Sequence, residues 1–348
     1  MPALWDLPDF DDHEGIHFFR DPAAGLTAII AVHSTMLGPA AGGVRLWHYS
    51  DKNAAVTDAL RLSQGMSYKN AMANLPMGGG KGVILAGESR AKTTELLAAF
   101  ARSVESLCGR YITAQDVGIS EADIIAISQD TKYVSGLPAG KAGAGGDPGP
   151  STAYGVFLGV KAAIKYRLGA DNCKDVRVAI QGVGSVGGGL ARYLAAEGAR
   201  LTIADINTDR ARKLADETRG MIVPADEIMA AEADVFSPCA LGAVLDKDSI
   251  GKLKAGIVAG GANNQLATKS DGSHMRTRNI LYAPDYVINA GGIINVALEY
   301  LGKGDRAEVN SRIEQIPERL TDIWQESERS GKPSSEIADA MAKKLIGR

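Results

Sequence analysis

The glycine pattern Gly182-Val183-Gly184-Ser185-Val186-Gly187 constrains the fold of this 348-residue chain more than any other feature. It follows residues 176–180, a β-branched segment that predicts a strand, and it opens a segment of helical spacing that runs to about Gly198. A G-x-G-x-x-G pattern between a strand and a helix is typical of the phosphate-binding turn of a Rossmann βαβ unit. The chain is therefore predicted to contain a dinucleotide-binding α/β domain.

Each glycine of this turn has its own physical role. Gly182 permits the tight turn, Gly184 lacks a Cβ that would block a pyrophosphate, and Gly187 lets the helix pack closely on the strand. The phosphates then meet the N-terminus of the helix, whose free N–H groups favour an anion. The alternative is a glycine-rich turn without a ligand. The predicted cofactor-binding residues of the turn are Gly182, Val183, Gly184, Ser185, Val186 and Gly187.

A carboxylate at the end of the next strand bears on the choice of dinucleotide. Residues 200–204 predict that strand, and Asp205, followed by Ile206, comes directly after it. A carboxylate at this place binds the adenosine ribose hydroxyls and repels a 2′-phosphate. The prediction is NAD rather than NADP, with Asp205 and Ile206 as cofactor-binding residues, although Arg210 and Arg212 lie just downstream.

The length of the chain predicts two domains, because 348 residues exceed the usual size of a single core. Residues 136–150 contain six glycines and three prolines, a composition that breaks regular structure and predicts a domain boundary and a hinge. The first domain is placed at 1–136 and the Rossmann domain at 137–330. The C-terminal helix, 331–348, is expected to complete the first domain.

Hydrophobic periodicity predicts further elements on both sides of this boundary. Ser120 and Asp123 have the spacing of a capping box, which predicts a helix to about residue 128. A strand is expected to deliver Asp116. The other elements expected in the first domain are short strands within 16–46, a strand at 111–114, and helices over 53–73 and 93–107. The helices expected at the end of the chain are 308–329 and 334–346.

Composition excludes several classes of function. The net charge of -3 and the absence of a basic stripe argue against nucleic acid as a partner. Cys108, Cys173 and Cys239 are scattered, so neither a disulfide framework nor a metal site is expected. No apolar run approaches the ~18 residues of a membrane span, and the N-terminus lacks a signal-peptide pattern. We expect a soluble cytoplasmic protein without a membrane partner.

Two lysines, Lys69 and Lys81, indicate chemistry in the first domain. Lysine is strongly hydrated and normally lies in water, yet Lys81 is flanked by glycines and by Val83-Ile84-Leu85, which predicts a buried strand. A Walker phosphate loop is excluded because Gly82 follows the lysine, where serine or threonine would have to reach magnesium. An ordinary turn leading into a strand, with a solvent-facing lysine, is the remaining alternative.

Seven segments in collinear order resemble the leucine/phenylalanine/valine dehydrogenases of the glutamate dehydrogenase superfamily. The resemblance extends from about residue 15 to the C-terminus. It implies reversible deamination of an L-amino acid to its 2-oxo acid and ammonia, with reduction of NAD, in a cleft between a substrate and oligomerisation domain and the Rossmann domain. The segments are GPAAGGVR (38–45), GMSYKN (65–70), GGGK (78–81), RYITAQDVG (110–118), PCALG (238–242), GANNQL (261–266) and APDYVINAGG (283–292).

The resemblance gives catalytic roles to three charged residues. Lys69 resembles the lysine that pairs with the substrate α-carboxylate, assisted by the main-chain N–H groups of Gly42 and Gly43. Lys81 resembles the lysine that activates the water attacking the imino acid. Asp116 resembles the acidic residue that holds the amino group and exchanges protons. A surface ion-pair cluster is the alternative interpretation of these three residues.

The physical chemistry of lysine agrees with these roles. A free lysine, with a pKa of ~10.4, is almost wholly protonated near neutral pH and is a poor base. Burial beside a second cation lowers the lysine pKa, and we expect Lys69 and Lys81 to have this effect on each other. Asp116 is expected to keep the pocket from accumulating uncompensated positive charge.

The substrate side chain is expected to be apolar. Glutamate-specific relatives carry a lysine just before the Gly42-Gly43 pair, whereas this chain has Ala41, so a glutamate side chain would be buried with its charge unpaired. By resemblance, the side-chain pocket comprises Ala41, Ala114, Ile293 and Val296. The remaining positions that the resemblance places near substrate or cofactor are Asn263 and Asn289, beside the nicotinamide and the substrate carboxylate, and Thr152, Cys239 and Ala240, beside the cofactor.

Other functions stay open at this point. The substrate could be aromatic (phenylalanine or tryptophan) rather than branched-chain (leucine or valine), because the leucine enzymes commonly carry a larger residue at the position of Ala41. A catalytically silent NAD-binding sensor is a second alternative. A 2-hydroxy acid dehydrogenase is a third, although none of the five histidines lies in a site-like motif. The resemblance also implies a homo-oligomer of unstated size.

Overall fold

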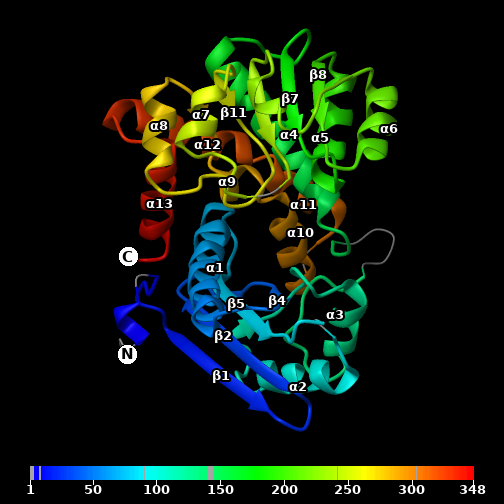
Figure 1. Cartoon of the computed structure of the whole chain (residues 1–348). Coiled ribbons are helices and arrows are strands. Elements are labelled where there is room, and N and C mark those ends of the chain that lie inside the picture. Colours follow the sequence, from blue (N-terminus) through cyan, green and yellow to red (C-terminus); the bar gives the residue numbers. More distant parts are fainter. Residues whose placement is uncertain (1–3, 8, 90, 139–143, 241, 303) are drawn as a thin grey trace. The chain divides into compact units, whose positions relative to one another are not determined.

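The structure is a computed structural model that describes residues 4–7, 9–89, 91–138, 144–240, 242–302 and 304–348. The chain forms two compact units, and each is described by itself (Figure 1). Unit 1 comprises Met1–Asp147, Asn295–Arg306 and Ala342–Arg348, and unit 2 comprises Pro148–Ile294 and Ala307–Met341. The prediction of a two-domain α/β protein is thereby confirmed.

The division between the units differs from the boundary expected from the sequence. It falls between Asp147 and Pro148, later than residue 136, and Asn295–Arg306 returns to unit 1 although the sequence pattern predicts it in the Rossmann domain. Only the end of the last helix, from Ala342, joins unit 1, rather than all of 331–348. The hinge expected within 136–150 includes residues 139–143, which lie outside the described residues.

Unit 1 is built on a mixed six-stranded sheet with the order β1-β2-β5-β3-β6, in which β4 also pairs with β5. The β1/β2 and β2/β5 pairs are antiparallel, whereas β3 and β4 run parallel to β5, and β6 runs parallel to β3. The strands are β1 (Gly15–Asp21), β2 (Leu26–Ser34), β3 (Ala40–Ala41), β4 (Val44–Trp47), β5 (Gly78–Leu85) and β6 (Tyr111–Ile112).

Helices cover both faces of this sheet. One face packs against α1 (Lys52–Met72), where Ala55 and Ala59 join Val83 of β5 in an apolar cluster. The opposite face forms the larger core of unit 1, with α2 (Thr94–Glu105) and α3 (Glu121–Ile127) packed on it. The predicted capping box at the start of α3 is confirmed, because the Ser120 side chain accepts from the Asp123 N–H and the Asp123 carboxylate accepts from the Ser120 N–H.

The glycine-rich segment before Val83 is strand rather than turn. A Cβ at Gly79 would collide with the backbone nitrogen of Ser67 in α1, and a Cβ at Gly80 would lie 2.7 Å from the Tyr111 ring on the opposite face. These residues are therefore glycines because β5 lies close to neighbours on both faces. Lys81 consequently lies inside a buried central strand, which excludes the alternative of a turn with a solvent-facing lysine.

Unit 2 contains a six-stranded sheet with the order β12-β11-β10-β7-β8-β9, in which every pair is parallel. Counted from β9, this is the 3-2-1-4-5-6 order of the dinucleotide-binding fold, whose ligands bind outside the carboxyl ends of the two central strands. The predicted Rossmann-type domain is confirmed. The strands are β7 (Arg177–Gln181), β8 (Arg200–Ala204), β9 (Met221–Ile222), β10 (Val235–Pro238), β11 (Ile257–Val258) and β12 (Leu281–Tyr282).

The helices of unit 2 include several that periodicity did not predict. The single helix expected over 308–329 is two helices, because Pro317 lies in the first turn of the second and cannot continue a helix from before it. No helix among the described residues is long and apolar enough to cross a membrane. The helices from this point of the chain are α4 (Gly149–Leu168), α5 (Ser185–Ala196), α6 (Thr208–Thr218), α7 (Lys247–Lys252), α8 (Asp271–Thr277), α9 (Asp285–Ile288), α10 (Gly291–Tyr300), α11 (Arg306–Ile313), α12 (Ile316–Ser330) and α13 (Ser334–Leu345). Of these, α10, α11 and α13 contribute residues to both units.

Candidate active site

Lys81 and Asp116 form an ion pair on the α1 face of the unit 1 sheet. Lys81 is only 5% exposed, and its Nζ lies 2.6 Å from Oδ2 of Asp116. Side chains alternate along a strand, so Lys81 shares its face with Gly79 and Val83, both of which contact or cluster with α1. The two predicted residues, 35 positions apart in the chain, are therefore brought together beneath one helix.

The predicted apolar residues of unit 1 lie on this same face. Ala41 pairs in register with Gly79 and with Ile112, and residues paired across a parallel ladder point to the same side. Ala114 follows Ile112 by two positions and so shares its side. Ala41 is buried and Ala114 is half-buried. Small apolar side chains therefore adjoin the Lys81 and Asp116 pair.

Lys69 is carried by α1 and is half-buried. Eleven positions, close to three helical turns, separate it from Asp58, so the two residues lie along one stripe of the helix. Met66, on the same stripe, lies near Gly42, because a Cβ at Gly42 would be 3.2 Å from the Met66 Cγ. This stripe therefore faces the part of the sheet beside β3, which carries Ala41.

Arg45 and Asp58 extend the ion pair and were not identified from the sequence. The Arg45 Nε lies 3.1 Å from Asp116 Oδ2, and its Nη1 lies 2.8 Å from Asp58 Oδ2. Tyr49 also donates its hydroxyl to Asp58 Oδ2, at 2.7 Å. Arg45 ends the GPAAGGVR segment, but its role depends on contacts among β4, α1 and the chain after β6, which no local pattern encodes.

Burial and neighbouring charges shift the pKa values of this cluster. Burial lowers the pKa of Lys81, and the positive charge of Arg45 adds to this effect, while Asp116 opposes it. Burial disfavours the ionised form of Asp116, yet Lys81 and Arg45 outweigh it and lower the Asp116 pKa. The sequence predicts that Lys69 is the cation that lowers the Lys81 pKa. In the structure, Arg45 is a cation that has this effect on Lys81. With its pKa lowered, Lys81 reaches the neutral form, which can act as a base, at a lower pH than a free lysine does.

The glycine pair at 42–43 differs in part from its expected role. The Gly42 N–H donates to the carbonyl oxygen of Ile112 at 3.1 Å, and the Gly42 carbonyl oxygen accepts from the Tyr111 hydroxyl at 2.6 Å. The Gly42 N–H is therefore engaged within the sheet rather than directed at a carboxylate. Gly43 packs beside Asp116, because a Cβ added to it would lie 2.9 Å from the Asp116 Cβ.

The glycines of the turn after β7 each match a physical role in unit 2. Gly182 has a φ of +84°, which favours glycine, and a Cβ there would lie 2.6 Å from the Cβ of Ala240. A Cβ at Gly187 would collide with the Gly182 carbonyl oxygen, so this glycine allows the close approach of helix and strand. Gly184 differs, since a Cβ there would meet only the Arg210 Nη1, at 3.8 Å. The space beside Gly184 and the uncapped start of α5 fit a pyrophosphate.

Asp205 and Ile206 lie at the carboxyl end of β8. The Asp205 side chain is buried, and its carboxylate accepts from the N–H groups of Val183 and Asn207, both at 2.8 Å. The Arg210 Nη1 lies 3.7 Å from the same carboxylate. Ile206 is 92% exposed. Asp205 thus holds the glycine turn in place, beside an apolar side chain that is open to solvent.

The other predicted cofactor residues surround the carboxyl ends of β7 and β10. Cys239 and Ala240 follow β10, and the Cys239 sulfur accepts from the Gly261 N–H at 3.4 Å. Leu241, in the same segment, lies outside the described residues. Thr152 in α4 donates its hydroxyl to the Pro148 carbonyl oxygen at 2.9 Å. Cys239 and Ala240 therefore lie beside the glycine turn, and Thr152 lies in α4 of the same unit.

The predicted asparagines Asn263 and Asn289 meet in unit 2. The Asn289 Nδ2 donates to Asn263 Oδ1 at 2.7 Å, and Asn289 is buried. Among the described residues, Asn289 Oδ1 is a buried oxygen without a hydrogen-bond partner. A buried acceptor of this kind suits a ligand with an N–H donor, such as a carboxamide. Ile293 and Val296, both predicted for the substrate side-chain pocket, lie in α10, Ile293 in unit 2 and Val296 in unit 1.

Comparison with known proteins identifies the family. Residues 13–133 match the model described as Glu/Leu/Phe/Val dehydrogenase, dimerisation domain, and residues 202–345 match Glutamate/Leucine/Phenylalanine/Valine dehydrogenase. A leucine dehydrogenase of Bacillus subtilis is 44% identical over 97% of this chain and 92% of its own length. The chain belongs to this family. It is accordingly an amino acid dehydrogenase, an oxidoreductase that uses a pyridine nucleotide, and the expected family resemblance is confirmed.

Two further members of the family are similar along nearly their whole length. A valine dehydrogenase of Streptomyces albus is 41% identical over 97% of this chain and 93% of its own. The crystal structure of L-tryptophan dehydrogenase from Nostoc punctiforme superposes with a TM-score of 0.85, at 40% identity over 96% of both chains. Relatives named for branched-chain and for aromatic amino acids are thus similar to this chain to almost the same degree.

A His-Asp-Arg cluster in unit 1 is unlike the base of a 2-hydroxy acid dehydrogenase. The His33 Nε2 lies 2.8 Å from the Arg348 Nη1 and 3.2 Å from Asp11 Oδ2. His33 is fully buried, and burial together with Arg348 lowers its pKa to about 4. A buried neutral ring does not reach a substrate.

Among the described residues, no group of three or more His, Cys, Asp or Glu side chains is arranged to hold a metal ion.

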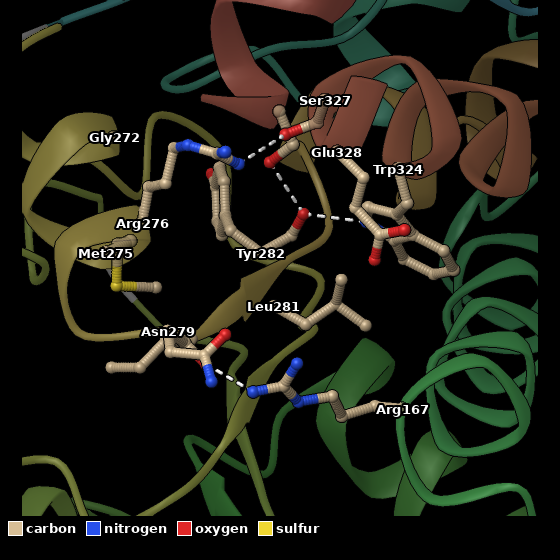
Figure 2. A pocket seen from close by; sticks show the side chains of 12 residues that line it. Arg167, Gly272, Met275, Arg276, Asn279, Leu281, Tyr282, Trp324, Ser327 and Glu328 are labelled. Carbon is tan, nitrogen blue, oxygen red and sulfur yellow. Dashed lines mark hydrogen bonds between the residues drawn. The ribbon is translucent and has the colours of Figure 1, made fainter. Parts of the chain in front are cut away.

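A pocket of about 300 Å³ lies beside β12, at the edge of the unit 2 sheet (Figure 2). Its two arginines have partners within the protein. Arg167 donates to the Asn279 carbonyl oxygen at 2.7 Å, and Arg276 donates to Ser327 Oγ at 3.5 Å. None of the residues that line this pocket is a predicted site residue.

Proposed function

We propose that this protein catalyses the reversible, NAD-dependent oxidative deamination of an apolar L-amino acid to its 2-oxo acid and ammonia. The observation that carries the proposal is the buried Lys81 and Asp116 pair on a sheet face that also carries Ala41 and Ala114. A buried lysine with a lowered pKa supplies a base, and small apolar neighbours suit an apolar substrate.

The reaction has two stages. NAD, when bound at the glycine turn of unit 2, supplies the acceptor for the hydride that leaves the substrate Cα, and the substrate becomes an imino acid. Lys69 pairs with the α-carboxylate of the substrate as a point charge. Neutral Lys81 removes a proton from water as the water oxygen attacks the imino carbon, and a carbinolamine forms. Collapse of the carbinolamine breaks its C–N bond and releases ammonia and the 2-oxo acid.

Asp116 balances the protons of these steps. Its carboxylate binds the substrate amino group, takes the proton from protonated Lys81, to which it is hydrogen-bonded at 2.6 Å, and passes that proton to the departing nitrogen, so that Asp116 is ionised again. Neutral Lys81 then takes the hydroxyl proton of the carbinolamine as the C=O bond forms and the C–N bond breaks, and it returns to its neutral form by releasing this proton to solvent. Because the pair is buried, this exchange occurs at low effective dielectric, where the attraction between the two groups is strong.

The substrate class follows from the position of Ala41. A glutamate side chain beside Ala41 would lack a cation for its carboxylate and would pay the cost of an unpaired buried charge. Ala114 and Val296, which also belong to unit 1, are further apolar residues proposed for this pocket. Alanine at position 41 leaves room for a large side chain, so the pocket accommodates leucine, valine or phenylalanine.

The proposed preference for NAD depends on Asp205. Its carboxylate already accepts two main-chain N–H groups and retains lone pairs for the ribose hydroxyls. The exposed Ile206 offers an apolar surface for the adenine ring. Arg210 neutralises part of the Asp205 charge, so the discrimination against a 2′-phosphate is weaker than an unpaired aspartate would give.

A homo-oligomer is the proposed state of assembly. Among the described residues, β1 pairs only with β2 and forms one edge of the unit 1 sheet. It carries Phe18, which is 59% exposed, and an edge strand with an exposed aromatic side chain favours association. Sedimentation velocity of the full chain tests this proposal, and a monomer at micromolar concentration would contradict it.

The experiment that tests the proposed function is a substrate panel with both nucleotides. We expect kcat/KM for leucine, valine or phenylalanine with NAD to exceed the values for glutamate and for the same amino acids with NADP. Tryptophan belongs in the panel, because an aromatic-specific enzyme is the alternative that the relatives support. A preference for glutamate over all of these amino acids would contradict the proposal. Nucleotide binding without turnover of any amino acid would favour the silent sensor.

A further inference from the structure

Four hydrogen bonds link Lys81 to Tyr49 through two carboxylates. Asp116 Oδ2 accepts from both Lys81 Nζ and Arg45 Nε, at 2.6 and 3.1 Å. Arg45 Nη1 donates to Asp58 Oδ2 at 2.8 Å, and the Tyr49 hydroxyl donates to the same oxygen at 2.7 Å. The guanidinium of Arg45 is thus held between two carboxylates, one of which is the partner of Lys81.

We propose that Arg45 is a positioning residue for the deamination: anchored by Asp58, it holds the Asp116 carboxylate in place and favours its ionised form while Lys81 releases and regains its proton. The proposal rests on the function assigned above to Lys81. It adds a residue pair, Arg45 and Asp58, that acts through Asp116 rather than on the substrate.

The charge balance of the cluster requires such a residue. With Lys81 protonated, two cations face two carboxylates. When Lys81 becomes neutral, Asp116 loses its nearest cation, and a half-buried carboxylate without a partner would take up a proton. Arginine does not release its proton in proteins, so Arg45 remains charged through the whole cycle. The Asp116 carboxylate therefore keeps one cation in both protonation states of Lys81.

Asp58 gives Arg45 a fixed orientation. Arg45 belongs to β4, and Asp58 belongs to α1, which covers the same face of the sheet. The Tyr49 hydroxyl donates to the same Asp58 oxygen and helps to fix this carboxylate. A guanidinium fixed in this way presents its Nε to Asp116 without the loss of side-chain entropy that an unanchored arginine would undergo.

The proposal makes opposite predictions for the two members of the pair. The charged groups that act on Lys81 are Asp116 after β6, Arg45 on β4 and Asp58 on α1, and the Tyr49 hydroxyl is bonded to Asp58. Lys69 is a further titratable group of α1. The positive charge of Arg45 lowers the Lys81 pKa, whereas the negative charge of Asp58 raises it. Removal of Arg45 must therefore raise that pKa, and removal of Asp58 must lower it.

The test is the pH dependence of kcat/KM for the best amino acid of the panel. Activity rises with pH as the free enzyme's base loses its proton, so the acid limb follows the Lys81 pKa. We expect Arg45→Gln to move this limb to higher pH by about one unit, Asp58→Asn to move it to lower pH, and Arg45→Lys to restore the parental position in part. The matched control is Arg61→Gln, an exposed arginine of α1 paired with Asp9, which should leave the profile unchanged.

The outcomes separate this proposal from a purely structural role and from failure of the proposed function. The proposal would be overturned if Arg45→Gln and Asp58→Asn lose activity while the acid limb stays at the parental pH. A purely structural role lowers activity without shifting the pKa of the base. If Arg45→Gln does not fold, the direction of the Asp58→Asn shift decides. If Lys81→Ala retains full activity, the function assigned to Lys81 fails. If Lys81→Ala is inactive and the acid limbs of Arg45→Gln and Asp58→Asn stay at the parental pH, only the inference about Arg45 fails.

Discussion

Gly79 of β5 lies directly against Ser67 of α1, so closely that a Cβ on Gly79 would overlap both the backbone nitrogen and the hydroxyl of Ser67. This contact sets the spacing between the helix that carries Lys69 and the strand that carries Lys81. The two lysines each lie two residues beyond the contact. The packing of this glycine therefore helps to set the relative position of Lys69, the proposed substrate anchor, and Lys81, the proposed base.

Gly79→Ala is expected to destabilise unit 1. The added methyl group must displace the α1 backbone rather than a flexible side chain, which corresponds to a loss of about 1–3 kcal/mol in the free energy of unfolding. Urea denaturation followed by circular dichroism measures this loss. The matched control is Gly65→Ala on α1 itself, where a Cβ meets nothing within 4 Å, and it should be neutral or more stable by up to about 1 kcal/mol. Equal stability of the two variants would contradict the account.

Gly184→Ala and Gly187→Ala are expected to fail in different ways. A Cβ at Gly184 meets only Arg210, so the fold should be unchanged, but the methyl group takes the space proposed for the pyrophosphate, and the KM for NAD should rise about tenfold or more. A Cβ at Gly187 collides with the Gly182 carbonyl oxygen, so this variant should lose thermal stability. Melting temperature without ligand and KM for NAD distinguish the two. An unchanged KM for NAD in Gly184→Ala would show that the pyrophosphate does not bind beside Gly184.

The sequence was sufficient for features whose cause is local. The Rossmann unit follows from a strand, a glycine turn, a helix and Asp205 in order, and the start of α3 follows from Ser120 and Asp123, three residues apart. The burial of Lys81 was also indicated by its apolar neighbours. These features depend on short spacings that one chain segment specifies.

The sequence was insufficient where the cause is a tertiary contact. The glycines before Lys81 have the composition of a turn, yet they pair with β2 and β3 as a strand, and glycine is needed there because α1 and Tyr111 lie close to its two faces. Arg45 is an ordinary polar residue of a strand until Asp58 and Asp116 are brought beside it. The return of Asn295–Arg306 to unit 1 likewise has no local signal.

Stability is expected to fall as the pH decreases from about 6.5 to about 4, in part because of His33. Its Nδ1 hydrogen-bonds Ser67 Oγ at 2.7 Å, and its Nε2 accepts from Arg348, so the folded state favours the neutral ring and the pKa is lowered to about 4. Between these pH values the unfolded state binds more protons, so the free energy of unfolding decreases by up to about 3 kcal/mol.

Urea denaturation of the parent and of His33→Gln at pH 7 and pH 5 tests this dependence. The variant lacks the group whose pKa differs between the two states, so its stability should change less between the two pH values, even though it is less stable at pH 7. Asp11, whose pKa is lowered to about 2, adds a further loss only below about pH 4. The same pH slope in parent and variant would exclude His33 as a source of the dependence.

Ala41→Leu is expected to narrow the substrate side-chain pocket. Ala41 is buried on the face that carries Lys81, so a larger side chain must extend into the space proposed for the substrate. We expect kcat/KM for phenylalanine to fall about tenfold relative to kcat/KM for valine. Steady-state kinetics with both amino acids give this ratio. A parallel decrease for both amino acids would place Ala41 outside the side-chain pocket.

The central claim is that Lys81 is the base of the reaction, and the most direct test is the initial rate of NADH formation by Lys81→Ala. The measurement uses the preferred apolar amino acid at alkaline pH, with the fold of the variant verified by circular dichroism and by NAD binding. The account predicts that the variant binds NAD normally and that its kcat falls about a thousandfold. A folded Lys81→Ala variant with unchanged turnover would contradict the mechanism.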